Sequence, residues 1–163
     1  MKAIGYYQPL PIDNAESLQD IELPAPVAGP RDLLVRVKAV SVNPVDTKIR
    51  KNAAPEAGQA KVLGWDAVGT IEAIGSGVQN FKVGDRVYYA GSIVRPGANS
   101  ELHTVDERIA AVAPKSLGDA QAAALPLTTI GSAWARVMVA SSKVTSAKSR
   151  HSVLRHRCRE VCM

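Results

Sequence analysis

Few side chains in the first 140 residues could carry out chemistry on their own. His103 is the only histidine before residue 150, and both cysteines, Cys158 and Cys162, lie near the C-terminal end. A zinc site needs several histidine or cysteine ligands, and a cysteine nucleophile needs a histidine close by. His103 lies in an alternating stretch, so we expect it to be a structural or surface residue. The body of the chain therefore predicts neither a metal site nor a disulfide framework.

The glycine-rich turn Gly75-Ser-Gly77 begins like a nucleotide-binding loop. Such a loop needs a third glycine and then the N-terminus of a helix, whose N–H groups bind the phosphates. The third position here is Asn80, and the sequence continues as Phe81-Lys-Val-Gly84 without helical periodicity. We interpret the segment as a plain turn between two strands.

The elements that would position a site are mostly short strands separated by turns. Alternation of apolar and polar residues is clearest through Val35, Val37 and Ala39, which is the period of a half-buried strand. Strands are expected at residues 2–7, 18–23, 33–42, 86–90, 101–105 and 109–113, and one more on each side of the Gly75 turn. This organisation favours a mainly β fold with short helices, arranged as a closed or nearly closed β-barrel.

Three short helical segments are expected between and after the strands. Asn43 can cap a helix, Pro44 suits its first position and Asp46 lies in the first turn, where the helix dipole favours an acid. This helix should end near residue 50. A second helix is expected at residues 120–125, and a third should start at Pro126 and reach about residue 139. From residue 141 the composition shifts to Ser, Lys, Arg and His, which predicts poor order.

The formal net charge of +5 belongs almost entirely to the C-terminal segment. Seven of the 20 lysines and arginines lie from Arg136 onward, together with one acid, Glu160, so the body holds 13 basic and 14 acidic residues. Nucleic-acid binding is therefore expected only if the tail at residues 141–163 acts by itself. The start does not resemble a signal peptide, and no apolar run reaches about 18 residues, so we expect a cytoplasmic protein without a membrane partner.

Five segments, in order, resemble the medium-chain dehydrogenase/reductase superfamily. They are Asn43-Pro-Val-Asp46, Leu63-Gly-Trp-Asp-Ala-Val-Gly-Thr-Ile-Glu-Ala-Ile-Gly75, Val83-Gly-Asp-Arg-Val87, Tyr89-Ala-Gly-Ser92 and Ala124-Leu-Pro-Leu-Thr128. The chain is most similar to zinc-type alcohol dehydrogenase-like proteins of the quinone oxidoreductase branch, over about residues 1 to 135. The resemblance implies a GroES-like β-barrel catalytic domain at residues 1–125. Residues 126–140 would then start the helix that leads to a Rossmann domain binding NADPH.

The metal ligands of the zinc-dependent relatives are missing at the matching positions. The family's first ligand, a cysteine, corresponds to Asn43, and its second ligand, a histidine, corresponds to Trp65. Only the neighbouring acid survives, as Asp66, and the four-cysteine structural lobe is absent from the sequence. An amide and an indole do not replace a thiolate and an imidazole. We therefore predict that the protein binds no zinc.

The resemblance also implies residues for a nicotinamide and substrate cleft. Asn43 would line the cleft, and it could cap its helix as well. Asp46 and Thr128 would lie near the cofactor, although Asp46 is equally suited to a structural place in the helix turn. Lys48 matches a proton-relay position and is the one possible catalytic residue. Its ammonium could stabilise a developing enolate or hydroquinone oxyanion, or it could simply be a solvated helix lysine.

Two aromatic residues are the candidates for substrate contact. Trp65 could be core filler or a wall of the cleft. Tyr88 and Tyr89 point to opposite sides of their strand, so one should face the barrel interior and the other the cleft. Tyr89 is taken here as the substrate-binding residue.

The C-terminal part of the sequence departs from the family. No glycine follows Gly131, so a Gly-x-Gly-x-x-Gly loop is impossible there, and the remaining residues are too few for a Rossmann domain. The stretch at residues 150–159 is typical of out-of-frame translation or of a truncated product. We expect the N-terminal domain of an NADPH-dependent, zinc-independent reductase of quinones or α,β-unsaturated carbonyls, inactive alone and dimeric if full length. A zinc-type alcohol dehydrogenase-like protein and a non-catalytic GroES-like interaction domain are the alternatives.

Overall fold

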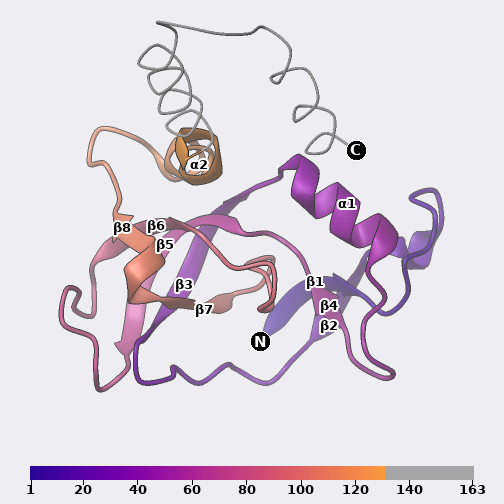
Figure 1. The fold of residues 1–163 in the computed structure, drawn as a ribbon, viewed down its shortest axis with the longest axis horizontal. Helices are drawn as coiled ribbons and strands as arrows, with labels where there is room; N and C mark the ends of the chain where they lie inside the picture. The colour runs from indigo at the N-terminus through magenta and orange to yellow at the C-terminus, as the bar shows by residue number, and fades with distance from the viewer. Residues whose placement is uncertain (131–163) are drawn as a thin grey trace, which may run out of the picture. The chain divides into compact units, whose positions relative to one another are not determined.

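The computed structural model describes residues 1–130, and Met1–Thr128 form a compact unit in it. Most of this unit is two antiparallel sheets (Figure 1). The three-stranded sheet has the order β2-β1-β4 and consists of β1 (Lys2–Tyr6), β2 (Gln19–Glu22) and β4 (Lys61–Val62). The five-stranded sheet has the order β7-β3-β5-β6-β8 and consists of β3 (Asp32–Ser41), β5 (Asp66–Ile74), β6 (Arg86–Ala90), β7 (Leu102–Asp106) and β8 (Ala110–Val112).

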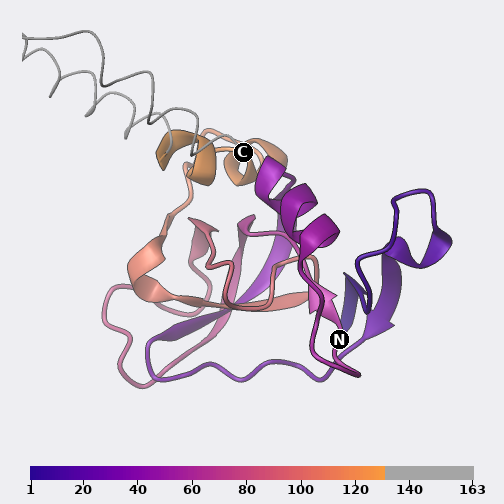
Figure 2. The same cartoon turned by 45° about the vertical axis from the view of Figure 1, so that its right-hand side comes forward.

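The helices of the described residues are short and lie beside the sheets. The helix α1 (Pro44–Asn52) follows β3 directly, and α2 (Asp119–Ala123) packs near β3, β5 and β6 (Figure 2). The segments Ala15–Ser17 and Glu107–Ile109 are single 3₁₀ turns. A further helical segment begins at Pro126, as expected. Its expected course to residue 139 and the basic segment 141–163 lie outside the described residues.

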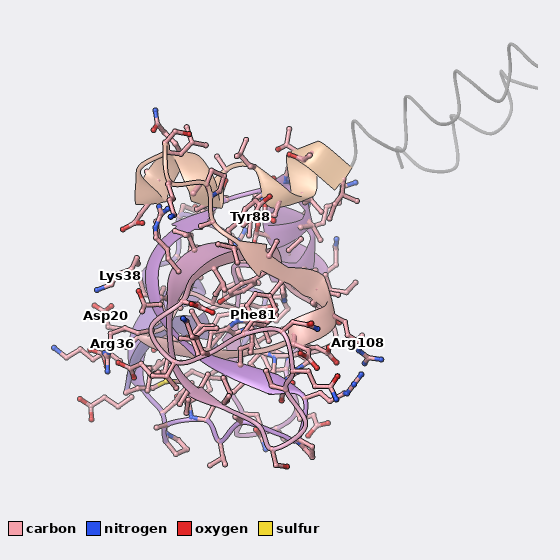
Figure 3. The ribbon with its side chains drawn as sticks, turned by 90° about the vertical axis from the view of Figure 1, so that its left-hand side faces the viewer. Asp20, Arg36, Lys38, Phe81, Tyr88 and Arg108 are labelled. Atoms are coloured by element: carbon pink, nitrogen blue, oxygen red, sulfur yellow. The ribbon has the colours of Figure 1, made fainter. Side chains whose placement is uncertain are left out.

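Apolar side chains alternate along the five-stranded sheet and pack on both of its faces. The core on one face consists of Leu33, Val35, Ala67, Ile71, Val87, Tyr89, Ala98 and Val105. On the other face Val68 and Tyr88 pack with Ala122 and Ala123 of α2, and Figure 3 shows Tyr88 close to the helical end of the sheet. Burying one large apolar side chain stabilises a fold by about 1.5–3 kcal/mol. The expected mainly β fold is confirmed. Within residues 1–130, no helix has the length and apolar character needed to cross a membrane.

The two sheets are connected but do not close into one continuous barrel. Residues 99–101 join them, because the Ile4 N–H donates to the Asn99 carbonyl at 2.8 Å and the Glu101 N–H donates to the Lys2 carbonyl at 3.0 Å. Ala3 also forms an isolated bridge with Ser100. The strands β4 and β8 have only two and three residues and cannot extend the ladders further. The closed form of the expected barrel is therefore not observed, and the two sheets remain separate ladders joined at residues 99–101.

The strand expected directly after Gly77 is wrong. Residues 78–85 form a loop, and the next strand begins only at Arg86. The Glu107 carboxylate accepts hydrogen bonds from the backbone N–H groups of Gln79 (3.1 Å) and Asn80 (3.4 Å). Because a side chain binds these N–H groups, they are not available to a neighbouring strand.

Candidate active site

Asp46 joins the first turn of α1 to the chain just before β5. Its carboxylate accepts hydrogen bonds from the backbone N–H of Asn43, at 2.7 Å, and from the backbone N–H of Gly64, at 2.8 Å. The first contact is the one that an acid at the third helical position makes in a capping box. Asp46 is 5% exposed, so both carboxylate oxygens are used inside the protein. A contact of Asp46 with a cofactor stays a prediction.

Asn43 is the N-cap residue of α1, and its side-chain amide turns towards β5. The amide nitrogen Nδ2 lies 3.0 Å from Oδ2 of Asp66 and 3.4 Å from the backbone oxygen of Ser41. Asn43 is half-buried at the junction of β3 and α1. The structure thus brings together Asn43, Asp46 and Asp66, while the role of Asn43 towards a cofactor stays a prediction.

Asp66 is a buried carboxylate, and it is the acid that remains beside the positions of the missing metal ligands. It is the first residue of β5, is 1% exposed, and accepts the backbone N–H of Leu127 at 3.1 Å and 3.2 Å on its two oxygens. Burial raises the pKa of Asp66, although the hydrogen bonds from Leu127 and Asn43 lower it. The signal that could have revealed it is an acid followed directly by three apolar residues at the start of a strand, because such an acid must find donors when it is buried.

Thr128 and Lys48 lie on exposed helical segments. Thr128 follows Leu127, and its hydroxyl donates to the carbonyl oxygen of Ala124 at 3.3 Å. Lys48 is exposed on α1. The exposure of Lys48 agrees with a solvated lysine, and it also leaves the ammonium able to meet a ligand. Roles for Thr128 in cofactor binding and for Lys48 in catalysis stay predictions.

Trp65 is packed as a core residue in this structure. Its side chain is 4% exposed and lies in a cluster with Tyr6 and Leu63, against which Val45 and Ile49 of α1 pack. The indole Nε1–H points towards the carbonyl oxygen of Arg95 at 3.4 Å. Of the two alternatives, core filler describes what the ring does here. Its contact with a substrate stays a prediction.

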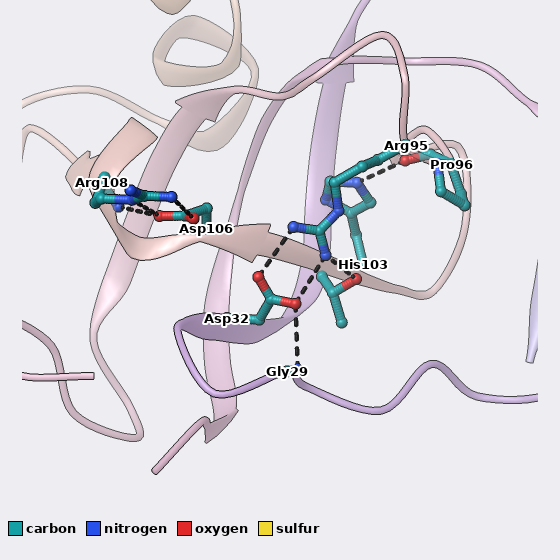
Figure 4. A network of polar contacts seen from close by, with 8 residues as sticks. Gly29, Asp32, Arg95, Pro96, His103, Asp106 and Arg108 are labelled. Carbon is teal, nitrogen blue, oxygen red and sulfur yellow. Dashed lines mark hydrogen bonds and ion pairs between the residues drawn. The ribbon is translucent and has the colours of Figure 1, made fainter. Parts of the chain in front are cut away.

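The loop that contains Arg95 is held to β3 by an ion pair. The Arg95 guanidinium donates to both carboxylate oxygens of Asp32, at 2.9 Å and 2.8 Å, and also to the Thr104 hydroxyl at 3.0 Å (Figure 4). This hydrogen-bonded pair lowers the pKa of Asp32. Since the Arg95 carbonyl meets the Trp65 indole, the ion pair also positions the wall against which the indole rests.

Tyr89 points into the core and pairs with His103. Its hydroxyl lies 3.0 Å from His103 Nδ1, and the two rings stack with centroids 5.5 Å apart. His103 Nε2 lies 3.0 Å from the Pro96 carbonyl (Figure 4). A carbonyl only accepts, so Nε2 carries the hydrogen. Burial lowers the pKa of His103 to about 4, so the ring is neutral and the Tyr89 hydroxyl donates to Nδ1. Tyr89 as a substrate-binding residue stays a prediction.

The described residues do not fit a zinc ion at the position of the family's metal site. Asn43 and Trp65 offer an amide and a buried indole, and the oxygens of Asp46 and Asp66 already accept hydrogen bonds from the protein. Within residues 1–130, no three histidine, cysteine or acidic side chains come together in a way that could hold a metal. Both cysteines lie outside the described residues.

Metal analysis should therefore find far less than one zinc per chain. Inductively coupled plasma mass spectrometry of the purified protein, after dialysis against zinc and then against zinc-free buffer, is the measurement. The double variant Cys158→Ser/Cys162→Ser is the control, because it removes the two thiols of the C-terminal segment. One tightly held zinc per chain in that double variant would contradict the prediction.

The comparison with known proteins identifies the family of this two-sheet domain. A model of the alcohol dehydrogenase GroES-like domain family matches residues 29–150. The chain belongs to this family, and thereby to the medium-chain dehydrogenase/reductase superfamily.

Its relatives carry the names of two kinds of oxidoreductase. A zinc-type alcohol dehydrogenase-like protein of Staphylococcus aureus is 43% identical over 130 residues, which are 80% of this chain and 38% of that protein. A crystal structure from Rhizobium etli, provisionally named a zinc-dependent alcohol dehydrogenase, is 56% identical with a TM-score of 0.78, over 80% of this chain and 38% of that one. Escherichia coli quinone oxidoreductase complexed with NADPH is 32% identical with a TM-score of 0.64, over 76% and 36%. The chain thus spans less than two fifths of the length of these relatives.

Proposed function

We propose that this chain supplies the barrel side of an NADPH-dependent, zinc-independent oxidoreductase that reduces a quinone or an α,β-unsaturated carbonyl. The observation that carries the proposal is the pair Asn43 and Trp65 at the positions of two zinc ligands, with the Asn43 amide bound to Asp66 and the Trp65 ring in the core. The similarity to a quinone oxidoreductase that binds NADPH supports it. In this proposal residues 1–125 are the catalytic domain, and the segment from Pro126 leads towards a nucleotide-binding domain.

The chemistry of such a site depends on placement more than on a strong catalyst. Bound NADPH would supply the hydride, and the protein would hold the acceptor at the correct distance and angle. The acceptor gains one hydride and one proton, so negative charge develops on its carbonyl oxygen until the proton arrives. Without a metal, cationic or N–H groups must stabilise that charge. Lys48 is the residue proposed for this role, with solvent as the source of the proton.

The position of Lys48 and Asn43 depends on how α1 is fixed at both ends. Asp46 holds the first turn, as described above. At the other end, the hydroxyl of Tyr6 lies 2.8 Å from the carbonyl oxygen of Ala53 and 3.1 Å from that of Ile49. Tyr6 is fully buried on β1. The helix is therefore held at its first turn by the chain just before β5 and at its other end by β1.

A chimera tests the proposed activity directly. Residues 1–128 would replace the corresponding barrel of E. coli quinone oxidoreductase, and NADPH oxidation would be followed at 340 nm with a quinone and with an enone. We expect turnover by the chimera, and none above the rate without protein for the 163-residue chain. The matched control is Lys48→Ala in the chimera, which should lower the turnover about tenfold or more because it removes the proposed charge stabilisation.

Three results would contradict the proposal. Turnover of NADPH by the 163-residue chain alone would refute its expected inactivity. A folded chimera that reduces neither acceptor would refute the function, and zinc-dependent alcohol oxidation by the chimera would favour the alcohol dehydrogenase alternative. Folding of the chimera would be checked by circular dichroism and by its binding of NADPH.

A further inference from the structure

Asp66 is placed where its side chain cannot easily move. It is the first residue of the central strand β5, and its backbone pairs with Ser41 of β3 on one side and with Ala90 of β6 on the other. With 1% of its surface exposed, its carboxylate depends on protein donors rather than on water. The donors that it has are the Asn43 amide and the Leu127 N–H.

The first consequence concerns the orientation of the Asn43 amide. Its nitrogen lies 3.0 Å from the Asp66 carboxylate and 3.4 Å from the Ser41 carbonyl, and an ionised carboxylate and a carbonyl only accept hydrogen bonds. A flipped amide would place its oxygen against two other oxygens, which is unfavourable. The hydrogen-bond partners therefore fix the orientation, with the nitrogen turned inward. The atom that Asn43 can offer to a ligand is its carbonyl oxygen.

The second consequence concerns the segment that leaves the barrel. Proline has no backbone N–H, so Leu127 carries the first N–H of the helical segment that begins at Pro126. The Asp66 carboxylate accepts this N–H with both oxygens. A carboxylate at the start of a helix is also favoured by the helix dipole. Asp66 thus caps the segment from a strand about sixty residues earlier in the chain.

We propose that Asp66 is a positioning residue that fixes the Asn43 amide so that it presents a hydrogen-bond acceptor to the ligand, and that ties this orientation to the start of the segment after Pro126. A carbonyl oxygen cannot stabilise the negative charge on a reduced acceptor. The ligand group that meets Asn43 must be an N–H or O–H donor, and charge stabilisation must come from another residue. The importance of this orientation for a ligand rests on the proposed function, but the orientation itself does not.

Hydrogen exchange in the ¹⁵N-labelled 163-residue chain tests the proposal. The variant Asp66→Asn keeps the shape of the side chain, but its NH₂ group must replace one carboxylate oxygen. That donor would face either the Asn43 NH₂ or the Leu127 N–H. We expect at least one of these two groups, the Asn43 side-chain NH₂ or the Leu127 backbone N–H, to exchange about tenfold faster in this variant, as the loss of a buried hydrogen bond predicts. Asp85→Asn is the matched control, because Asp85 also accepts a backbone N–H, from Lys82 at 3.0 Å, and it should leave both rates unchanged.

The unmodified chain provides a second measurement, which applies even if Asp66→Asn does not fold. The Asn43 side-chain NH₂ should exchange at least about tenfold more slowly than those of the exposed residues Asn52 and Asn80. Equal rates would overturn the proposal, and so would an Asp66→Asn variant that folds and changes neither the Asn43 nor the Leu127 exchange rate. No nucleotide is present in either measurement. Failure here is therefore distinct from failure of the chimera to oxidise NADPH.

Discussion

Gly97→Ala is expected to lower the free energy of unfolding by about 3 kcal/mol, as overpacking against rigid atoms does. A Cβ atom at Gly97 would lie 2.2 Å from the carbonyl oxygen and 2.3 Å from the carbonyl carbon of Leu63, and 2.8 Å from the carbonyl oxygen of Gly64. These are backbone atoms, so they cannot rotate away. The segment around Gly97 also donates hydrogen bonds to the same neighbouring chain. The Gly97 N–H donates to the Val62 carbonyl at 3.0 Å, and the Asn99 N–H donates to the Leu63 carbonyl at 2.9 Å. Any shift that relieves the clash weakens these bonds as well.

The clash at Gly97 would also disturb the candidate site, because it displaces Leu63 and Gly64. Leu63 and Gly64 directly precede Trp65, and the Gly64 N–H is one of the two donors to Asp46. Urea unfolding followed by far-ultraviolet circular dichroism measures the loss. Gly58→Ala is the control, because Gly58 has a φ of +76° but nothing within 4 Å of the added Cβ. That variant has only the conformational cost, about 1 kcal/mol. Equal losses in the two variants would show that the close approach at Gly97 is not a constraint.

The strands of the larger sheet could be predicted because their own residues determine them. Leu33 and Val35 alternate with more polar neighbours on β3, and both are fully buried. The start of α1 was equally local, since Asn43, Pro44 and Asp46 are each suited to their place in its first turn. The period of the sequence shows which residues share a face of a strand. It therefore predicts the strand and the grouping of its side chains without knowledge of their partners.

What the sequence did not reveal depends on partners far away in the chain. In the loop at residues 78–85, Glu107 binds the N–H groups of Gln79 and Asn80, and no local feature of the loop indicates this distant partner. The role of Asp66 depends on donors from Asn43 and Leu127, which are 23 and 61 residues away. Alternation placed Tyr88 and Tyr89 on opposite faces correctly, but it could not say which face was the core.

The candidate site can be understood as a replacement of metal binding by hydrogen bonding. A zinc site holds its helix and strand together through the ion, whereas here Asn43, Asp46 and Asp66 join α1, the start of β5 and the segment after Pro126 directly. Each carboxylate accepts from two groups of the protein. The cost of burying these charged groups is thereby offset by charge-assisted hydrogen bonds. These hydrogen bonds occupy the oxygens that a metal would need, which supports the zinc-independent chemistry proposed.

The stability of the domain should fall by about 3 kcal/mol as the pH is lowered from 6.5 to 4, because of His103. Burial lowers the pKa of His103 from 6.5 to about 4 in the folded protein. Between these values the unfolded chain binds a proton that the folded protein does not bind, so the free energy of unfolding decreases as the pH falls. Well above pH 6.5 the ring is neutral in both states, and the full stability is present.

The neighbours of His103 explain why the folded protein resists protonation. Its Nδ1 already accepts the Tyr89 hydroxyl, so a second proton on the ring would face that donor. Arg95 repels the added charge, while the Pro96 carbonyl and Asp32 favour it, but burial outweighs both. Asp66 has the opposite effect on the pH dependence of stability. Because burial raises its pKa, the folded state binds a proton on Asp66 before the unfolded chain does as the pH falls. A comparison with a variant at position 103 isolates the histidine from this effect.

His103→Gln is the variant that tests this assignment. Glutamine can donate to the Pro96 carbonyl and accept from the Tyr89 hydroxyl, but it does not titrate. We expect it to be less stable than the unmodified protein at pH 7, because its packing against the Tyr89 ring is poorer, and to lose much less stability on acidification. Urea unfolding at four pH values between 7 and 4.5 gives the slope of the free energy of unfolding against pH for the unmodified protein and for the variant. The slope of the unmodified protein should be steeper, because only that protein contains a buried base that must stay uncharged while the unfolded chain becomes protonated. Parallel slopes would mean that His103 is not held neutral, and the tautomer assigned above, with its hydrogen on Nε2, would then be wrong.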